Sequence, residues 1–289
     1  MYRWSQGRCR SRSSGGSGPP PVPKGGPAGG LEGDMEGRAW GQGTTARYRG
    51  GVSVVELRAA VALLGRFPAL SGVDLTIHAG ETILLRGPNG AGKTTLLHLC
   101  AGLLRPESGS VQVLDHDLTD RAGRRSVRRR VALLGHTTGL YEDLTVGENL
   151  RFWARAAGLS TVDADRRLDD ARKRLEVSDR LVDQPVHTLS AGQRRRTSLA
   201  ALLARRPDLW LLDEPHAGLD QSGRDLVDGL IGDAVAAGGT VVVSSHELDR
   251  VAALSPRMVT LAGGAVVDGS GADSPPPVEE PSIGQENRR

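Results

Sequence analysis

Residues 81–104 read ETILLRGPNGAGKTTLLHLCAGLL, and this stretch decides the fold. An apolar run enters a turn that fits the phosphate-loop pattern G-x-x-x-x-G-K-[ST] in full, and a helical pattern follows it. Glycines let backbone N–H groups turn inward around phosphate oxygens, and the helix N-terminus adds partial positive charge. An ordinary glycine-rich surface turn would explain neither the apolar run before it nor the helical pattern after it. We therefore expect phosphate binding by Gly87, Pro88, Asn89, Gly90, Ala91, Gly92, Lys93, Thr94 and Thr95.

Two acids at the end of a later apolar run extend this prediction. Residues 209–214 read LWLLDE, which indicates a buried strand that ends in Asp213 and Glu214. With Lys93 on the β- and γ-phosphates, Mg²⁺ belongs between the Thr94 hydroxyl and Asp213. Glu214 is then the candidate general base that polarises the attacking water. The alternative is a strand that leads into an acidic surface turn, and an apolar run with two acids is weak evidence when taken alone.

The chain alternates short β-branched or leucine-rich runs with longer helical patterns. We expect strands over 52–58, 73–77, 81–86, 110–114, 131–134, 208–213, 240–245, 257–262 and 265–268. We expect helices over 92–103, 147–157, 164–175, 191–205, 221–236 and 247–254. Strands that lead through glycine turns into helices predict an α/β fold with a mostly parallel sheet. Residues from about 138 to 190 read as all-helical, which predicts an inserted helical subdomain.

Composition divides the chain into a body and two ends. Residues 1–50 contain 13 glycines and five prolines and carry a net charge of +5, and residues 270–289 carry −2. Both ends have too little apolar surface to offset their ordering entropy, so we expect a disordered basic arm and a disordered tail. The body, 51–269, is neutral, and we therefore expect no nucleic-acid partner. A run of six arginines over 121–130 is interpreted as a solvated face between two strands.

Several classes of protein are excluded at this stage. No stretch approaches the roughly 18 consecutive apolar residues of a membrane-spanning helix, and the basic N-terminus has no apolar run after it as a secretory signal would. Cys9 and Cys100 are the two cysteines, which rules out a disulfide scaffold and favours a cytoplasmic location.

A third motif identifies the family. Residues 189–193 read LSAGQ and begin a helical pattern rich in alanine and leucine. The motif ends 20 residues before Asp213. Here the sequence resembles the ATP-binding cassette (ABC) ATPases, whose signature is LSGGQ. The resemblance spans about 52–269, with AGLD at 217–220 in the place of the D-loop and His246 in that of the switch histidine. It implies a P-loop NTPase core with an antiparallel β subdomain and a helical insert.

The resemblance also implies a mechanism. Two such domains face each other head to tail, so each ATP touches the phosphate loop of one and the signature of the other. Since this chain has one cassette, it would act as a homodimer or pair with a homologous ATPase. The cofactors implied are ATP and Mg²⁺, and the partner is an integral membrane permease that holds the protein at the cytoplasmic face. The residues implied in trans are Ser190, Ala191, Gly192 and Gln193, with Asp220 in the D-loop and His246 on the γ-phosphate and water.

Four positions depart from the family pattern. Ala191 replaces the first signature glycine, which is tolerable if the residue is helical. His136 occupies the usual Q-loop glutamine position, where it is either a ligand of water and metal or a plain loop histidine. The adenine-stacking aromatic is missing, with Leu64 in its place and Phe67 three residues later. His216 lies where many members have threonine, and a role at the nucleotide interface or a structural role both stay open.

The choice within the family rests on smaller resemblances. The short separation of Lys93 and Ser190 leaves room for one helical subdomain and none for the long coiled coil of a DNA-repair ATPase. Soluble translation-type members usually carry two cassettes, so we favour a transporter subunit, and an exporter because little sequence follows the last strands. LGHTTGL at 134–140, LSAGQRRR and SHELDR resemble the heme exporter subunit of cytochrome c maturation. The alternative is the ATPase of an exporter of drugs, lipids or polysaccharides. A soluble ABC ATPase without a transport role is a less favoured alternative.

Overall fold

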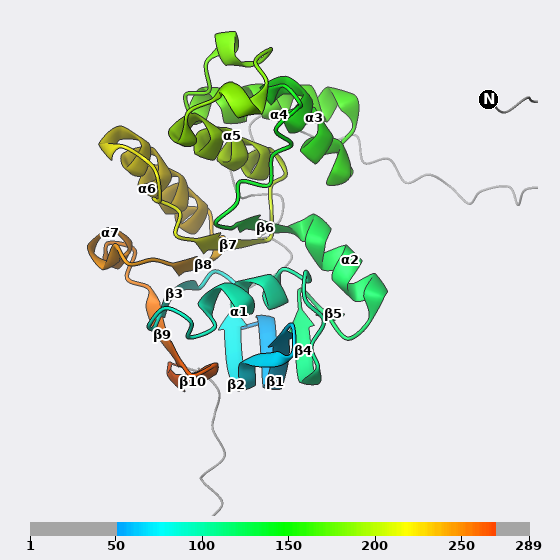
Figure 1. Cartoon of the computed structure of the whole chain (residues 1–289), viewed down its shortest axis with the longest axis vertical. Coiled ribbons are helices and arrows are strands. Elements are labelled where there is room, and N and C mark those ends of the chain that lie inside the picture. Colours follow the sequence, from blue (N-terminus) through cyan, green and yellow to red (C-terminus); the bar gives the residue numbers. More distant parts are fainter. Residues whose placement is uncertain (1–50, 270–289) are drawn as a thin grey trace, which may run out of the picture. The chain divides into compact units, whose positions relative to one another are not determined.

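The computed structural model describes residues 51–269, and the predicted arm 1–50 and tail 270–289 lie outside the described residues. Groups of one to three strands alternate with single helices or groups of helices along this part of the chain (Figure 1). The strands form two sheets, one of six strands in the order β10-β9-β3-β8-β7-β6 and one of four in the order β2-β1-β4-β5.

The six-stranded sheet carries the ends that build the site. Its members are β3 (Thr82–Arg86), β6 (Val131–Leu134), β7 (Leu209–Asp213), β8 (Thr240–Ser244), β9 (Arg257–Ala262) and β10 (Ala265–Asp268). All neighbours pair in parallel except the edge strand β10, which is antiparallel to β9. Because ligands of open parallel sheets bind beyond the carboxyl ends of the strands, the ends of β3, β6, β7 and β8 are the place to look.

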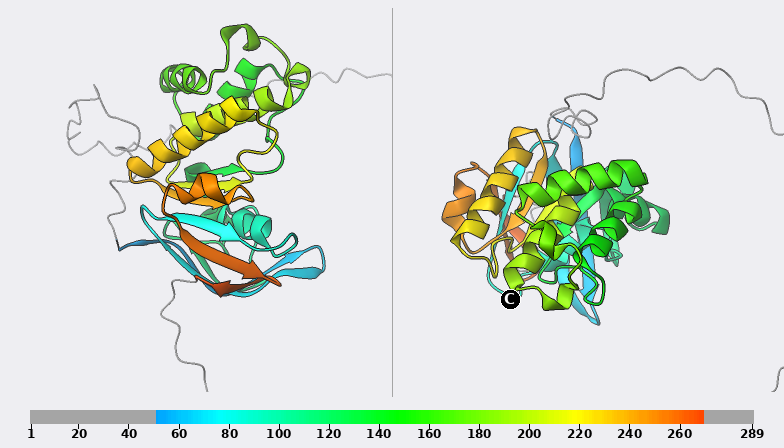
Figure 2. Two further views of the ribbon diagram at one scale, coloured as in Figure 1. Left: turned by 90° about the vertical axis from the view of Figure 1, so that its left-hand side faces the viewer. Right: turned by 90° about the horizontal axis from the view of Figure 1, so that it is seen from above.

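Alternating side chains divide the core into two halves. Leu209 and Leu211 on β7 pack to one side with α1 (Lys93–Cys100) and the four-stranded sheet. Trp210 and Leu212 pack to the other side with the helices. Successive residues of a strand point to opposite faces, so a strand such as β7, which is apolar up to its final Asp213, must be covered on both. In Figure 1 and in the left view of Figure 2, α1 lies between the two sheets.

The second sheet is fully antiparallel, as the family resemblance implies. It is made of β1 (Ser53–Leu64), β2 (Phe67–His78), β4 (Ser108–Val113) and β5 (His116–Asp117). The first two strands are much longer than the predicted 52–58 and 73–77, because LLGRFPAL forms a hairpin and not a loop. Gly65 makes the turn at φ 66°, and Pro68 is tolerated because β2 is an edge strand.

Helices cover the other face of the parallel sheet. They are α3 (Val146–Ala156), α4 (Thr161–Arg174), α5 (Ala191–Ala204), α6 (Gln221–Ala236) and α7 (Leu248–Ala252), with short 3₁₀ turns at Asp179–Leu181 and Val186–Thr188. Thr145 and Glu148 form a capping box at the start of α3, which fixes that boundary. α3, α4 and α5 pack on one another and share a core with the sheet. The first two of these lie within the range predicted for the helical subdomain.

The arginine run forms a helix that the sequence reading missed. α2 (Arg121–Arg130) begins at Asp120, whose carboxylate accepts the N–H groups of Ala122 and Gly123. Only Gly123 and Val127 of this helix are buried, so its apolar stripe is too narrow to give a helical period. The interpretation as a solvated face between two strands agrees with this exposure, whereas the list of expected helices lacked this one.

Candidate nucleotide site

The phosphate loop joins β3 to α1 with the geometry that the motif predicts. Gly87, Gly90 and Gly92 have φ values of 137°, 79° and 103°, which residues with a Cβ rarely adopt. Space is a second reason for glycine, since a Cβ at Gly87 would lie 2.1 Å from the Leu261 carbonyl oxygen. Gly92 caps α1 without a side-chain hydrogen bond, so the helix N-terminus is left open toward an anion.

Lys93 and Thr94 follow at the first turn of α1. The Lys93 ammonium folds back over the loop and donates to the carbonyl oxygens of Gly87 and Pro88 at 2.7 and 3.1 Å. The Thr94 hydroxyl donates to Asp213 Oδ2 at 2.7 Å, although 119 residues separate the two. The sheet therefore brings together the hydroxyl and the carboxylate that the sequence assigned to one cation.

The end of β7 holds the two acids in different environments. Asp213 is buried at 7% exposure. Glu214 has a left-handed backbone at φ 46°, and its N–H donates to the Ser244 carbonyl at 2.8 Å. Its carboxylate approaches His246, whose ring Nε2 lies 3.5 Å from Oε1 and whose backbone N–H lies 3.3 Å from Oε2. Glu214 and His246 thus point at each other from the ends of neighbouring strands.

A groove of about 780 Å³ unites these residues. It is lined by the phosphate loop, by Asp213 and Glu214, by His136 and His246, and also by Ala191 at the start of α5. Leu64 lines it, whereas Phe67, at 79% exposure, does not. Thr137 and Thr138 from LGHTTGL and Ala217 and Gly218 from AGLD line it as well. Sequence reasoning did not single out the remaining lining residues, which are Ala69, Glu142, Arg194, Arg195 and Ser244.

The signature residues begin α5. Ser190 is the N-cap, and its hydroxyl accepts the Gln193 N–H at 3.2 Å while Gln193 Oε1 accepts the Ser190 N–H at 2.9 Å. Ala191 is the first helical residue and is exposed, as its tolerance requires. Asp220 caps α6 in the same way through the Gly223 N–H at 2.9 Å, and this bond, first among several contacts, lowers the pKa of Asp220.

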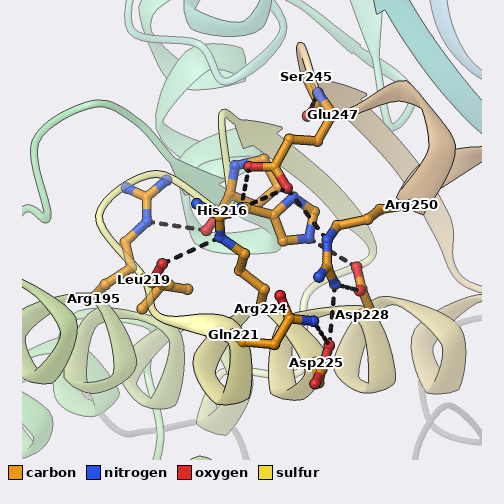
Figure 3. Close-up of polar contacts among 11 residues, drawn as sticks. Arg195, His216, Leu219, Gln221, Arg224, Asp225, Asp228, Ser245, Glu247 and Arg250 are labelled. Atoms are coloured by element: carbon orange, nitrogen blue, oxygen red, sulfur yellow. Dashed lines mark hydrogen bonds and ion pairs between the residues drawn. The ribbon is translucent and has the colours of Figure 1, made fainter.

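His216 contacts α6, away from the groove. Its ring is 2% exposed, and Nε2 lies 2.8 Å from Asp228 Oδ1. Asp228 also pairs with Arg250 of α7 (Figure 3). Arg224 joins the same cluster, because it donates to the Leu219 carbonyl at 3.1 Å and contacts Glu247, the neighbour of His246. Of the two interpretations left open for His216, the structure supports the structural one.

Comparison with known proteins agrees with this geometry. Residues 70–217 match the family model described as ABC transporter. The chain belongs to the ABC transporter family. It is the ATP-binding, ATP-hydrolysing component of such a transporter, and the predicted α/β P-loop fold is confirmed. None of the helices in residues 51–269 combines the length and apolar character needed to cross a bilayer.

The individual relatives are named for different transported substrates and do not decide between them. Over 72% of its length this ABC ATPase is 41% identical to the cobalt import ATP-binding protein CbiO of Rhodobacter capsulatus, covering 76% of that protein. It is 39% identical to the cytochrome c biogenesis ATP-binding export protein CcmA of Cupriavidus pinatubonensis, over 64% of this chain and 79% of that one. A solved dimer of the cassette MJ0796 with ADP and Pi aligns with TM-score 0.66, 28% identity, and coverage of 74% and 97%.

Proposed function

We propose that this ABC ATPase energises heme export for c-type cytochrome biogenesis. The observation that carries the proposal is the stretch 134–140, LGHTTGL, in which His136 stands at the Q-loop position, as in the heme exporter subunits that the sequence resembles. The 39% identity to CcmA supports it. The substrate itself contacts a permease, so the assignment rests on analogy within the family.

The site residues receive roles under this proposal. Lys93 holds the β- and γ-phosphates, and Glu214 polarises the attacking water with His246 beside it. Ser190 and the Gly192 backbone meet the γ-phosphate of a partner cassette across a head-to-tail dimer. The dimeric cassette with ADP and Pi supports such an arrangement, because this chain aligns with nearly all of it.

The metal implied by the family fits the donor set. The Thr94 hydroxyl and the Asp213 carboxylate are hard oxygen ligands that lie within hydrogen-bond distance of each other, and Mg²⁺ is usually held by one or two carboxylates together with phosphate oxygens and waters. In residues 51–269 no group of three His, Cys, Asp or Glu side chains could form an all-protein cage. Mg²⁺ would neutralise charge on the phosphates, and His136 lines the groove as the third candidate ligand.

We infer that a permease segment binds in a second, mostly apolar groove of about 530 Å³. It shares Thr94 and His136 with the nucleotide groove, so an occupant would lie next to the site of hydrolysis. Its apolar side is formed by Ala101, Leu103, Leu133, Leu140, Trp153 and Leu202. Leu103 is 53% exposed, which leaves apolar surface for a partner to cover. Binding there would place the protein peripherally at the cytoplasmic face of the membrane.

Cobalt import is the second candidate, because CbiO is 41% identical to this chain. The test is deletion of the gene in its native host, followed by heme staining of c-type cytochromes and by cobalt uptake. We expect loss of stainable cytochromes and unchanged cobalt uptake, with rescue by the parent gene and none by Glu214→Gln. Normal cytochromes with reduced cobalt uptake would establish the second candidate, and normal results in both would leave the drug, lipid and polysaccharide exporters.

A further inference from the structure

Arg195 is a buried cation one turn into the signature helix. It lies on α5 and is 4% exposed. Burial lowers its pKa, and the nearby charges of Asp213 and Glu214 oppose that shift. A buried cation is costly unless its donors are satisfied. The groups that satisfy this one therefore indicate what it does.

All four of its hydrogen bonds go to backbone carbonyl oxygens. Nη2 donates to the carbonyls of Asp213 and Glu214 at 3.1 and 2.5 Å, and Nε reaches that of Pro215 at 3.4 Å. Nη1 donates to the carbonyl of Gly135 at 2.7 Å, next to His136. Figure 3 shows the side chain of Arg195 pointing from α5 toward the loop that carries His216, directly after Pro215. Four of the five guanidinium donors are thus engaged, which leaves little capacity for a phosphate ligand.

The three consecutive carbonyls converge on one guanidinium around a strained residue. Glu214 has φ 46°, a conformation that residues with a Cβ adopt only where their surroundings enforce it. The Ser244 carbonyl holds its N–H side, and Arg195 holds its carbonyl side. The planar fork of arginine spreads its donors over three nitrogens at fixed angles, whereas a lysine ammonium donates from one freely rotating nitrogen.

We propose that Arg195 is a positioning residue that locks the backbone of Glu214, so that the carboxylate faces the attacking water in the nucleotide groove. The proposal rests on the general-base role given to Glu214 above. The hydrogen bond from Arg195 to the Gly135 carbonyl keeps the guanidinium from rotating. One side chain therefore holds both Glu214 and the loop that contains His136. Misplacing a catalytic group by about 1 Å costs roughly 10²-fold in rate.

The experiment measures ATP hydrolysis by the full chain for Arg195→Gln and Arg195→Lys. We expect kcat to fall about 100-fold in the first variant, with KM changed less than about threefold, and an intermediate kcat in the second. Arg205→Gln is the matched control, because Arg205, which is partly buried at the end of α5, also donates to backbone carbonyls, those of Arg128 and Val131. Its melting temperature should fall comparably, with kcat near the parent's.

A double-mutant cycle with Glu214→Gln separates positioning from general damage. If Arg195 acts through Glu214, adding Arg195→Gln to Glu214→Gln lowers the single-turnover rate no further. Multiplicative losses, a parental kcat in Arg195→Gln, or an equal loss in Arg205→Gln would overturn the proposal. Should Arg195→Gln fail to fold, the same cycle is run with Arg195→Lys. A parental rate in Glu214→Gln alone would instead overturn the role of Glu214 itself.

Discussion

Leu64 offers the sharpest test of how this ATPase holds adenine. It lies at the end of β1, lines the nucleotide groove and is 66% exposed. Fully burying a leucine side chain contributes about 1.5–3 kcal/mol, so covering the exposed two-thirds by the base leaves roughly 1–2 kcal/mol to gain. Leu64→Ala should therefore weaken ATP binding by about 5- to 30-fold. Leu64→Tyr should tighten it by about 2- to 12-fold, because ring stacking adds roughly 0.5–1.5 kcal/mol.

Phe67 is the matched control because it is paired with Leu64 across the hairpin turn. It does not line the groove, so Phe67→Ala should change the affinity by less than about twofold. Affinities are measured by titration calorimetry with ATP in the Glu214→Gln background, which prevents turnover. Inorganic tripolyphosphate serves as a ligand without a base, and its affinity should be the same in all variants.

Three results would refute this reasoning. If Phe67→Ala weakens ATP binding while Leu64→Tyr changes nothing, Phe67 moves onto the base and the hairpin rearranges on binding. If all three variants match the parent, neither side chain touches adenine and the alignment of LLGRFPAL with the family is wrong. Equal changes for ATP and tripolyphosphate would place the effect on the phosphate loop.

Three further outcomes are expected. Lys93→Ala should abolish hydrolysis and greatly weaken ATP binding in the same assays, because the mobile cation on the phosphates is lost. Gly123→Ala should lower the free energy of unfolding by about 1–3 kcal/mol, since its Cβ would lie 2.1 Å from the Asp117 carbonyl oxygen. The control is Gly229→Ala, which has open space around the added Cβ and should not lower the melting temperature. Burial raises the pKa of Cys100 from its ordinary 9.0 to about 12; folding then favours the thiol, so the free energy of unfolding should fall as pH rises from about 9 to 12, and denaturant titrations of Cys100→Ala should lack this component.

Motifs with a fixed local context could be located from the sequence. The phosphate loop needs a strand before it and a helix after it, and both flanks are visible in residues 81–104. The β7 strand and its two acids were predicted for the same reason, because a strand buried on both faces reads as a continuous apolar run. What joins them was not visible: the 2.7 Å contact between Thr94 and Asp213 depends on strand order in the sheet.

Residues that act through backbone groups escaped the sequence analysis. Arg195 stands among three arginines in LSAGQRRR, and no pattern separates it from its neighbours. Arg194 donates to the Leu189 carbonyl, and Arg196 pairs with Glu176. Only the position of Arg195 on the inner face of α5 sets it against three carbonyls of the loop. A periodicity argument would also have placed a hydrophobic residue there.

The signature shows why a departure from a motif need not remove its function. LSAGQ differs from the family pattern at Ala191, and the structure places that residue at the first helical position, where its methyl group is exposed. A glycine is required where φ is positive or space is missing, and neither holds here. The capping box of Ser190 and Gln193 is complete without a glycine between them at the first helical position, so the helix N-terminus keeps its start and its direction. The tolerance for Ala191 therefore follows from the position of the helix boundary. The same argument excludes alanine at Gly92, because φ is positive there and an added Cβ would lie 2.7 Å from the Ala69 carbonyl oxygen.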